Sequence, residues 1–222
     1  MSHNPALDTI LNFIRKKVTL NRPAQKDGAA ILPGEPNRSR NRIFVGTAAI
    51  TAVSAVVLWL MGQPLCCTCG GWPPWSWDIW SPHNSQHLID PYTFTHVLHG
   101  VLLCGLLYWL PRSVPESTRY LIAIVLEAIW EIQENSPLII ERYRSVTISQ
   151  GYLGDSVANS IGDIIACALG YWLAYRWRMY PSLAFFVLTE LVLAIWIRDN
   201  LILNVVMLLC PMDAIQQWQM GN

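Results

Sequence analysis

The chain has 222 residues, of which 53% are hydrophobic and only 14% are charged, and its formal net charge is zero. Since soluble domains contain about 25% charged residues, this composition excludes a disordered chain, a nucleic-acid-binding protein and a compact soluble enzyme. Long uncharged segments and eleven tryptophans instead predict an all-α fold, a polytopic transmembrane helix bundle of five or six spans.

The first 43 residues differ in composition from the rest of the chain. Residues 1–43 contain eight Lys and Arg against three Asp and Glu, which predicts a basic cytoplasmic tail. Residues 8–20 have the pattern of a short amphipathic helix that lies on anionic lipid, and a disordered basic tail explains the same composition equally well. The remaining residues, 44–222, are expected to form the transmembrane helical domain.

Five segments beyond the tail are long and apolar enough to cross a bilayer, which takes roughly 20 residues. Pro137 is expected to break or kink the third segment after Ser136, because proline lacks the backbone N–H of a helix interior. Residues 201–210 are too few for a straight crossing and predict a tilted sixth span, a re-entrant piece or an interfacial helix. The five candidate spans are 44–62, 92–110, 119–140, 156–175 and 180–197.

Lys and Arg residues indicate which loops face the cytoplasm. Placing residues 1–43 inside also places the loops 111–119 and 176–179 inside, each with two arginines, so that twelve of the fifteen Lys and Arg face the cytoplasm. The loop 63–91 has no Lys or Arg. The sequence therefore predicts an inner-membrane protein with a cytoplasmic N-terminus and an outer loop at 63–91.

The outer loop opens with three cysteines, Cys66, Cys67 and Cys69. They allow one disulfide with an odd thiol, simple loop packing, or a metal contact if nearby histidines join. Their spacing matches no standard zinc pattern. The tryptophans at 72–80 suit the membrane–water interface, where amphipathic rings accumulate.

Polar residues recur at helical spacing in three of the predicted spans, and each set therefore lines one helix face. Charged side chains at membrane depth are costly and usually mark a cavity, a pathway or a site. With the orientation above, all three stripes lie in the outer half of the bilayer. The stripes are Glu127, Glu131, Glu134 and Asn135 in the third span, Asp155, Asn159 and Asp163 in the fourth, and His96 and His99 in the second.

Several chemistries fit these stripes. A divalent ion such as zinc or manganese, held by mixed nitrogen and oxygen ligands, would activate water for hydrolysis. Two close carboxylates sharing a proton would form a metal-free dyad, with Asp155 and Asp163 as one pairing. The same acids would suit a transport or proton pathway with Glu190 as a relay, or simple interhelical hydrogen bonding.

The preferred hypothesis is a hydrolase or transferase that acts on a lipid or envelope precursor at the periplasmic leaflet. The alternatives are a small transporter, a proton-coupled permease and a non-catalytic membrane assembly factor. The bilayer is the expected partner. The expected metal ligands are His96, His99, Glu131 and Asp163, the catalytic residues Glu127, Glu131, Asp155 and Asp163, and the substrate contacts Asn135, Arg142, Arg144 and Asn159, whose arginines would bind an anionic headgroup.

Four stretches, at 84–100, 127–144, 152–163 and 198–219, resemble a family of multi-pass inner-membrane proteins from alphaproteobacteria that is catalogued as a domain of unknown function. The resemblance covers about residues 44–220 and rests mainly on the series ENSP, RYR and GDSxxNSxxD. It implies an inner-membrane location and several spans, without an established activity. The CCTC sequence departs from the family's more usual isolated CxCG-like element. The family's recurring polar positions correspond here to His87, Asp90, His96, His99, Glu127, Glu131, Asn135, Arg142, Arg144, Asp155, Asn159, Asp163 and Asp199.

Overall fold

The computed structural model describes residues 36–69, 74–149, 151–177 and 179–221. Over these residues the chain is helical and contains no strand, so the all-α class is confirmed for the part described. The helices are α2 (Pro36–Leu60), α3 (Thr93–Leu107), α4 (Glu116–Glu134), α5 (Pro137–Val146), α6 (Val157–Arg176), α7 (Met179–Trp196), α8 (Leu201–Leu209) and α9 (Asp213–Met220).

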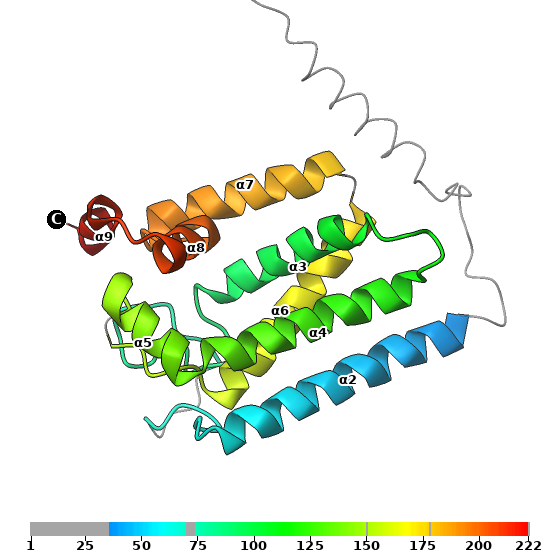
Figure 1. The fold of residues 1–222 in the computed structure, drawn as a ribbon, viewed down its shortest axis with the longest axis horizontal. Helices are drawn as coiled ribbons and strands as arrows, with labels where there is room; N and C mark the ends of the chain where they lie inside the picture. The colour runs from blue at the N-terminus through cyan, green and yellow to red at the C-terminus, as the bar shows by residue number, and fades with distance from the viewer. Residues whose placement is uncertain (1–35, 70–73, 150, 178, 222) are drawn as a thin grey trace, which may run out of the picture.

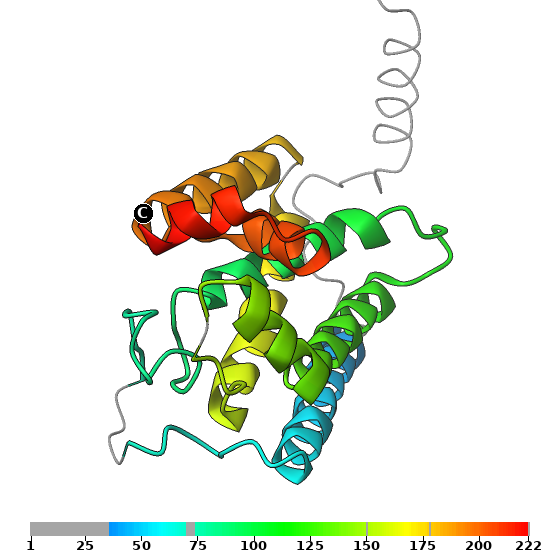
Figure 2. The same cartoon turned by 60° about the vertical axis from the view of Figure 1, so that its left-hand side comes forward.

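The longer helices run side by side and alternate in direction along the chain (Figure 1). The short helices α5, α8 and α9 gather at one end of this bundle, together with the connection between α2 and α3 (Figures 1 and 2). We call this the loop end, and its described residues are 61–69, 74–92, 135–149, 151–156 and 197–221. The connections α3–α4 and α6–α7 lie at the opposite end, as the alternation of the predicted spans requires.

Three of the helices have the length and hydropathy of a membrane span, namely residues Ser39–Leu60 of α2 and the whole of α6 and α7. The apolar helix α3 has 15 residues, and α8 has nine residues and rises only about 13 Å at 1.5 Å per residue. Large apolar side chains are exposed along α2 and α7, as expected where a helix faces lipid. These features indicate a membrane protein with at least three apolar spans.

Two predicted boundaries differ from those observed. Helix α2 begins at Pro36, so residues 36–43 of the expected tail are helical, while the expected helix at 8–20 lies outside the described residues. The third predicted span, 119–140, is divided into α4 and α5. The break at Pro137 is confirmed, and the Ser136 hydroxyl caps α5 by accepting from the amide of Ile139.

Helices α3 and α6 approach each other more closely than ordinary side chains allow. A Cβ atom on Gly100 of α3 would overlap the carbonyl oxygen of Cys167, and one on Gly170 of α6 would overlap the carbonyl oxygen of Val97. Small residues that let two backbones meet are typical of helix packing in membranes. This contact fixes the histidine-bearing start of α3 against α6.

The N-terminus of α6 is bound by both halves of the outer loop. The amides of Val157 and Ala158 donate to the carbonyl oxygens of residues 64 and 65 at 2.8 and 3.0 Å, and the amide of Ser156 donates to the carbonyl of Ser85 at 2.9 Å. These bonds satisfy amide groups that a helix start leaves without intrahelical partners. The two ends of the loop therefore meet over the start of α6.

Candidate functional site

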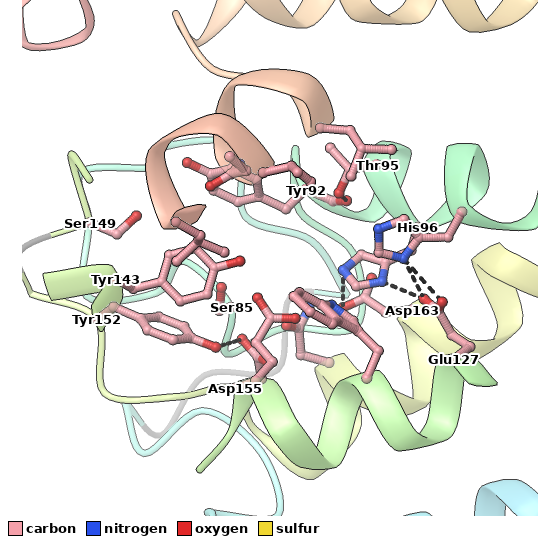
Figure 3. A pocket seen from close by; sticks show the side chains of 18 of the residues that line it. Ser85, Tyr92, Thr95, His96, Glu127, Tyr143, Ser149, Tyr152, Asp155 and Asp163 are labelled. Carbon is pink, nitrogen blue, oxygen red and sulfur yellow. Dashed lines mark hydrogen bonds and ion pairs between the residues drawn. The ribbon is translucent and has the colours of Figure 1, made fainter. Parts of the chain in front are cut away.

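Residues from all three polar stripes line one cavity of about 380 Å³ close to the loop end, although Glu131 and Asn135 are not among them (Figure 3). Its walls come from α3, α4, α5, α6 and α8, and its lining combines acids, histidines and tyrosines with large apolar side chains. The apolar lining residues are Leu102, Leu103, Leu126, Trp130, Leu201, Val205 and Leu208.

At the polar end of the cavity, Glu127 of α4 holds both histidines of α3. Its Oε1 lies 2.6 Å from Nδ1 of His96, and its Oε2 lies 3.0 Å from Nδ1 of His99. Glu127 is 2% exposed and His96 is 6% exposed. The i and i+3 spacing of the histidines places both on one face of α3, and there both contact the same carboxylate.

His96 is surrounded by three carboxylates. Besides Glu127, Oε1 of Glu131 lies 3.2 Å from His96 Nδ1, and Oδ2 of Asp163 lies 4.0 Å from His96 Nε2. Glu131 is 0% exposed. Neither oxygen of Glu131, nor Oδ1 of Asp163, accepts a hydrogen bond from any residue that the structure describes. Buried carboxylate oxygens without donors are costly unless a proton or a cation neutralises them.

Two overlapping groups have the convergence that a metal ion needs. One consists of His96, His99 and Glu127, and the other of His96, Glu131 and Glu134, with the donor atoms of each group within 4.8 Å of one another. Carboxylate oxygens and imidazole nitrogens are ligands for zinc and manganese. Of the four expected metal ligands, His96 belongs to both groups, His99 to the first and Glu131 to the second, while Asp163 lies near His96 but belongs to neither. Glu127 and Glu134 complete the two groups.

Asp155 and Asn135 bind each other at the loop end. Asn135 Nδ2 donates to Asp155 Oδ2 at 2.9 Å, and the Asp155 amide donates back to Asn135 Oδ1 at 2.6 Å. The hydroxyl of Tyr152 donates to Asp155 Oδ1 at 2.9 Å. Burial raises the pKa of Asp155 to about 6. Asp155 lines the cavity, whereas Asn135 does not line it and is hydrogen-bonded to Asp155.

The other three expected substrate contacts, Asn159, Arg142 and Arg144, differ in whether they line the cavity. Asn159 lines the cavity and donates through Nδ2 to the carbonyl of His87 at 2.8 Å, which ties the outer loop to α6. Arg142 donates through Nε and Nη2 to the carbonyl of Leu208, at 3.0 and 2.9 Å, near the C-terminal end of α8. Arg144 is exposed on α5. Neither arginine lines the cavity.

Glu190 has a structural position in the fifth predicted span. Its two carboxylate oxygens accept from the amides of Leu201 and Ile202, each at 3.0 Å, at the N-terminus of α8. An acid at a helix N-terminus is favoured by the unpaired amides and by the helix dipole. Glu190 therefore acts as a cap supplied by another helix.

Asp199 fastens the C-terminal helices to α3. Its oxygens accept from the hydroxyl of Tyr92 at 3.1 Å, from Asn204 Nδ2 at 3.1 Å and from Gln219 Nε2 at 2.9 Å. Tyr92 and Asn204 line the cavity. Asp199 thereby positions one wall of the site.

The sequence patterns do not reveal several lining residues. Asn84 and Ser85 of the outer loop, Ser149, and Asn204 and Val205 of α8 also line the cavity, to which the folding of the loop end brings them. These residues lie outside the three periodic stripes. No spacing signal could have identified them.

Comparison with known proteins places this fold in a family. Residues 58–221 match the family described as "Protein of unknown function (DUF2585)". The chain is 45% identical over 172 residues to a UPF0314 protein of Rhizobium meliloti, which covers 78% of this chain and 87% of that protein. It is 44% identical over 178 residues to a UPF0314 protein of Sphingopyxis alaskensis (79% and 93%), and 41% identical over 181 residues to one of Paracoccus denitrificans (81% and 93%).

No solved structure matches the chain. The resemblance to an uncharacterised alphaproteobacterial family is confirmed by the family match. The matched residues include all of the acid–histidine cluster, the name we give to His96, His99, Glu127, Glu131, Glu134 and Asp163. The chain belongs to the DUF2585 family of proteins of unknown function.

Proposed function

We propose that this protein is a multi-pass inner-membrane enzyme, a hydrolase or transferase that binds a divalent metal ion beside His96 and acts on a lipid or lipid-linked envelope precursor. The observation that carries the proposal is the joining, in one cavity, of a buried acid–histidine cluster and a wall of large apolar side chains. A polar reacting group and a hydrocarbon chain would each find a suitable surface there.

The apolar lining extends to the outer surface of the bundle. Leu102 of α3, Leu126 of α4 and Val205 of α8 line the cavity, yet they are 49%, 40% and 44% exposed. A cavity whose rim is exposed and apolar opens toward hydrocarbon when the bundle lies in a bilayer. This geometry favours a substrate that enters sideways from the membrane.

The polar end supplies the chemistry. Buried carboxylates without hydrogen-bond donors need a proton or a cation, and mixed carboxylate and imidazole donors suit zinc or manganese as that cation. A bound divalent ion would polarise an ester or phosphoryl oxygen and lower the pKa of a bound water. Glu127 would hold the imidazole rings of His96 and His99 in place, as carboxylates hold ligating histidines elsewhere.

The membrane orientation completes the proposal. With residues 1–43 in the cytoplasm, the loop end and its cavity lie at the periplasmic leaflet. The transport alternative has less support, since the carboxylate of Glu190 is already occupied by the amides of α8.

Metal content of the detergent-purified protein tests the proposal. His96→Ala and Glu131→Gln are each expected to lose about one divalent ion per chain while retaining the helical circular dichroism of the unaltered protein. Glu141→Gln, on the exposed face of α5, is the matched control and is expected to retain the ion. Equal metal content in all four proteins, after incubation with zinc and manganese, would rule out the metal-dependent site.

The lipid part of the proposal has its own variant. Leu102→Trp places a large ring in the apolar lining, away from the acids. It is expected to keep the metal and to reduce the lipid that co-purifies and is detected by native mass spectrometry. Unchanged lipid occupancy in Leu102→Trp would argue against a lipid substrate in this cavity.

A further inference from the structure

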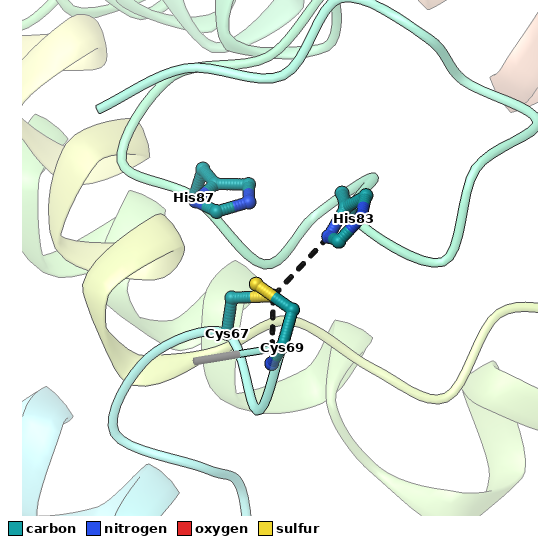
Figure 4. A group of neighbouring side chains, drawn as sticks. All are labelled: Cys67, Cys69, His83 and His87. Carbon is teal, nitrogen blue, oxygen red and sulfur yellow. Dashed lines mark hydrogen bonds between the residues drawn. The ribbon is translucent and has the colours of Figure 1, made fainter. Parts of the chain in front are cut away.

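A second group of metal-binding side chains lies in the outer loop, away from the acid–histidine cluster (Figure 4). It consists of Cys67 and Cys69, shortly after α2, and of His83 and His87, shortly before α3. One donor atom from each of the four residues lies within 4.8 Å of the other three. We propose that these four side chains bind a structural zinc ion that fastens the two halves of the outer loop together.

The donor atoms of the group lie close together, and binding of one tetrahedral zinc ion would require the two sulfurs to separate to about 3.7 Å, since each zinc–sulfur bond is about 2.3 Å long. The sulfur of Cys67 lies 2.6 Å from the sulfur of Cys69 and 3.4 Å from Nδ1 of His83. The ring centroids of His83 and His87 are 5.6 Å apart. Figure 4 shows the rings of His83 and His87, from one segment of the loop, beside the thiols of Cys67 and Cys69, from another segment. Two thiolates and two imidazoles form a standard tetrahedral donor set for structural zinc.

The spacing along the chain is close to that of known zinc sites. Thirteen residues separate Cys69 from His83, and three separate His83 from His87. Both intervals fall within the ranges found in two-cysteine, two-histidine sites. Only the cysteine pair, with one intervening residue, is tighter than usual, which is why the sequence pattern alone does not identify the site.

The surrounding hydrogen bonds preorganise the four ligands. The start of α6 binds the cysteine half of the loop through the carbonyls of residues 64 and 65, and it binds the histidine half through the carbonyls of Ser85 and His87. The amide of Ser85 also donates to Oδ2 of Asp90 at 2.9 Å. Because both halves are anchored on one helix start, the thiols and imidazoles meet with little further ordering of the chain.

A zinc ion in the outer loop would stabilise one wall of the cavity without contacting a molecule bound inside the cavity. Asn84 and Ser85, which lie between the two histidines, line the cavity. A zinc ion on His83 and His87 would hold this short segment against α6. The inference therefore assigns the outer loop a metal-dependent structural role, and it does not depend on the proposed enzymatic activity.

Cobalt substitution separates this site from the acid–histidine cluster. Only the outer-loop site has thiolate ligands, so only there does bound Co²⁺ give a sulfur-to-metal charge-transfer band in the near ultraviolet. The purified full-length protein, reduced and stripped with a chelator, is expected to develop this band with one equivalent of Co²⁺ and to lose it when one equivalent of Zn²⁺ is added.

Variants assign the band to its ligands. Cys67→Ser and His87→Ala are expected to abolish the band, whereas Cys66→Ser, the matched neighbour outside the group, retains it. Glu131→Gln should retain the band as well, so a failure of the proposed active-site metal would leave this result unchanged. If a loop variant does not fold, the band in the unaltered protein and its Cys66→Ser control still decides the matter.

Two outcomes would overturn the inference. One is the absence of the charge-transfer band in reduced, folded protein. The other is a disulfide between Cys67 and Cys69 in protein isolated without reductant, detected by mass spectrometry after alkylation of free thiols.

Discussion

The carboxylate of Asp155 is bound by two side chains, one just before α5 and one between α5 and α6. Asn135 and Tyr152 each donate to one of its oxygens, yet burial raises the pKa of Asp155 from an ordinary value of 3.8 to about 6. The folded protein therefore binds this proton more tightly than the unfolded chain. Below about pH 4 both states hold the proton, and above about pH 6 the folded state carries the cost of a buried charge.

This difference predicts a pH-dependent effect of Asp155→Asn. The melting temperature of the variant relative to the unaltered protein should increase as the pH rises from 4 to 7, by the equivalent of up to about 3 kcal/mol. The asparagine can still accept from Asn135 and donate to Tyr152. Thermal denaturation of chelator-treated protein in detergent measures the effect, and a constant difference across this pH range would contradict it.

Glu190 provides a second test at the level of single residues. Because its carboxylate caps α8, Glu190→Ala should lower the free energy of unfolding by about 1–2 kcal/mol. Glu190→Gln, which keeps one acceptor oxygen, should fall between that variant and the unaltered protein. Denaturant titration in detergent provides the measurement, with Glu141→Ala as the exposed control. A proton relay would instead leave the stability of both Glu190 variants unchanged.

At the scale of elements, the crossing of α3 and α6 is the contact on which the site depends. Gly100→Ala would drive a methyl group into the backbone of Cys167, and the expected cost is about 3 kcal/mol or more, because neither helix backbone can move aside. Gly105→Ala is the matched control on the same helix, since an added Cβ there would meet no atom within 4 Å beyond its chain neighbours and the adjacent backbone of α3.

The two alanine variants should therefore differ sharply in the amount of folded protein. Gly105→Ala is expected to be neutral or more stable by about 0.5–1 kcal/mol, because alanine has the better helix propensity. Size-exclusion chromatography of the detergent-solubilised proteins gives the yields of folded protein. Similar yields for both variants would mean that α3 and α6 are not in backbone contact.

The same elements show what the sequence could predict. Residues such as Glu127 and Asp163 repeat at helical intervals within one segment, so their common face is a local property and could be inferred from periodicity. The break at Pro137 is local in the same way. Arg142 and Glu190 could not be assigned, because their partners are backbone groups of α8. The carbonyl that Arg142 binds lies 66 residues away in the chain, and no side-chain pattern encodes that contact.

At the scale of the whole molecule, the fold predicts on which side of the membrane the C-terminal helices lie. The loop end contains both the outer loop and the C-terminal helices α8 and α9 (Figure 1). Helix α8 is too short to return the chain across a bilayer, since nine residues rise about 13 Å against a hydrocarbon core of roughly 30 Å. If the outer loop is periplasmic, α9 is expected to lie on the periplasmic side too, and the described helices then cross the membrane an odd number of times.

Reporter fusions test this arrangement directly. Alkaline phosphatase, which is active only in the periplasm, should be active when fused after residue 222 and inactive when fused within the loop between α3 and α4. A fluorescent protein that folds only in the cytoplasm should give the opposite pattern at the same two sites. A cytoplasmic C-terminus would require α8 and α9 to form a sixth crossing, and it would place the wall that Asp199 anchors on the wrong side of the membrane for a periplasmic site.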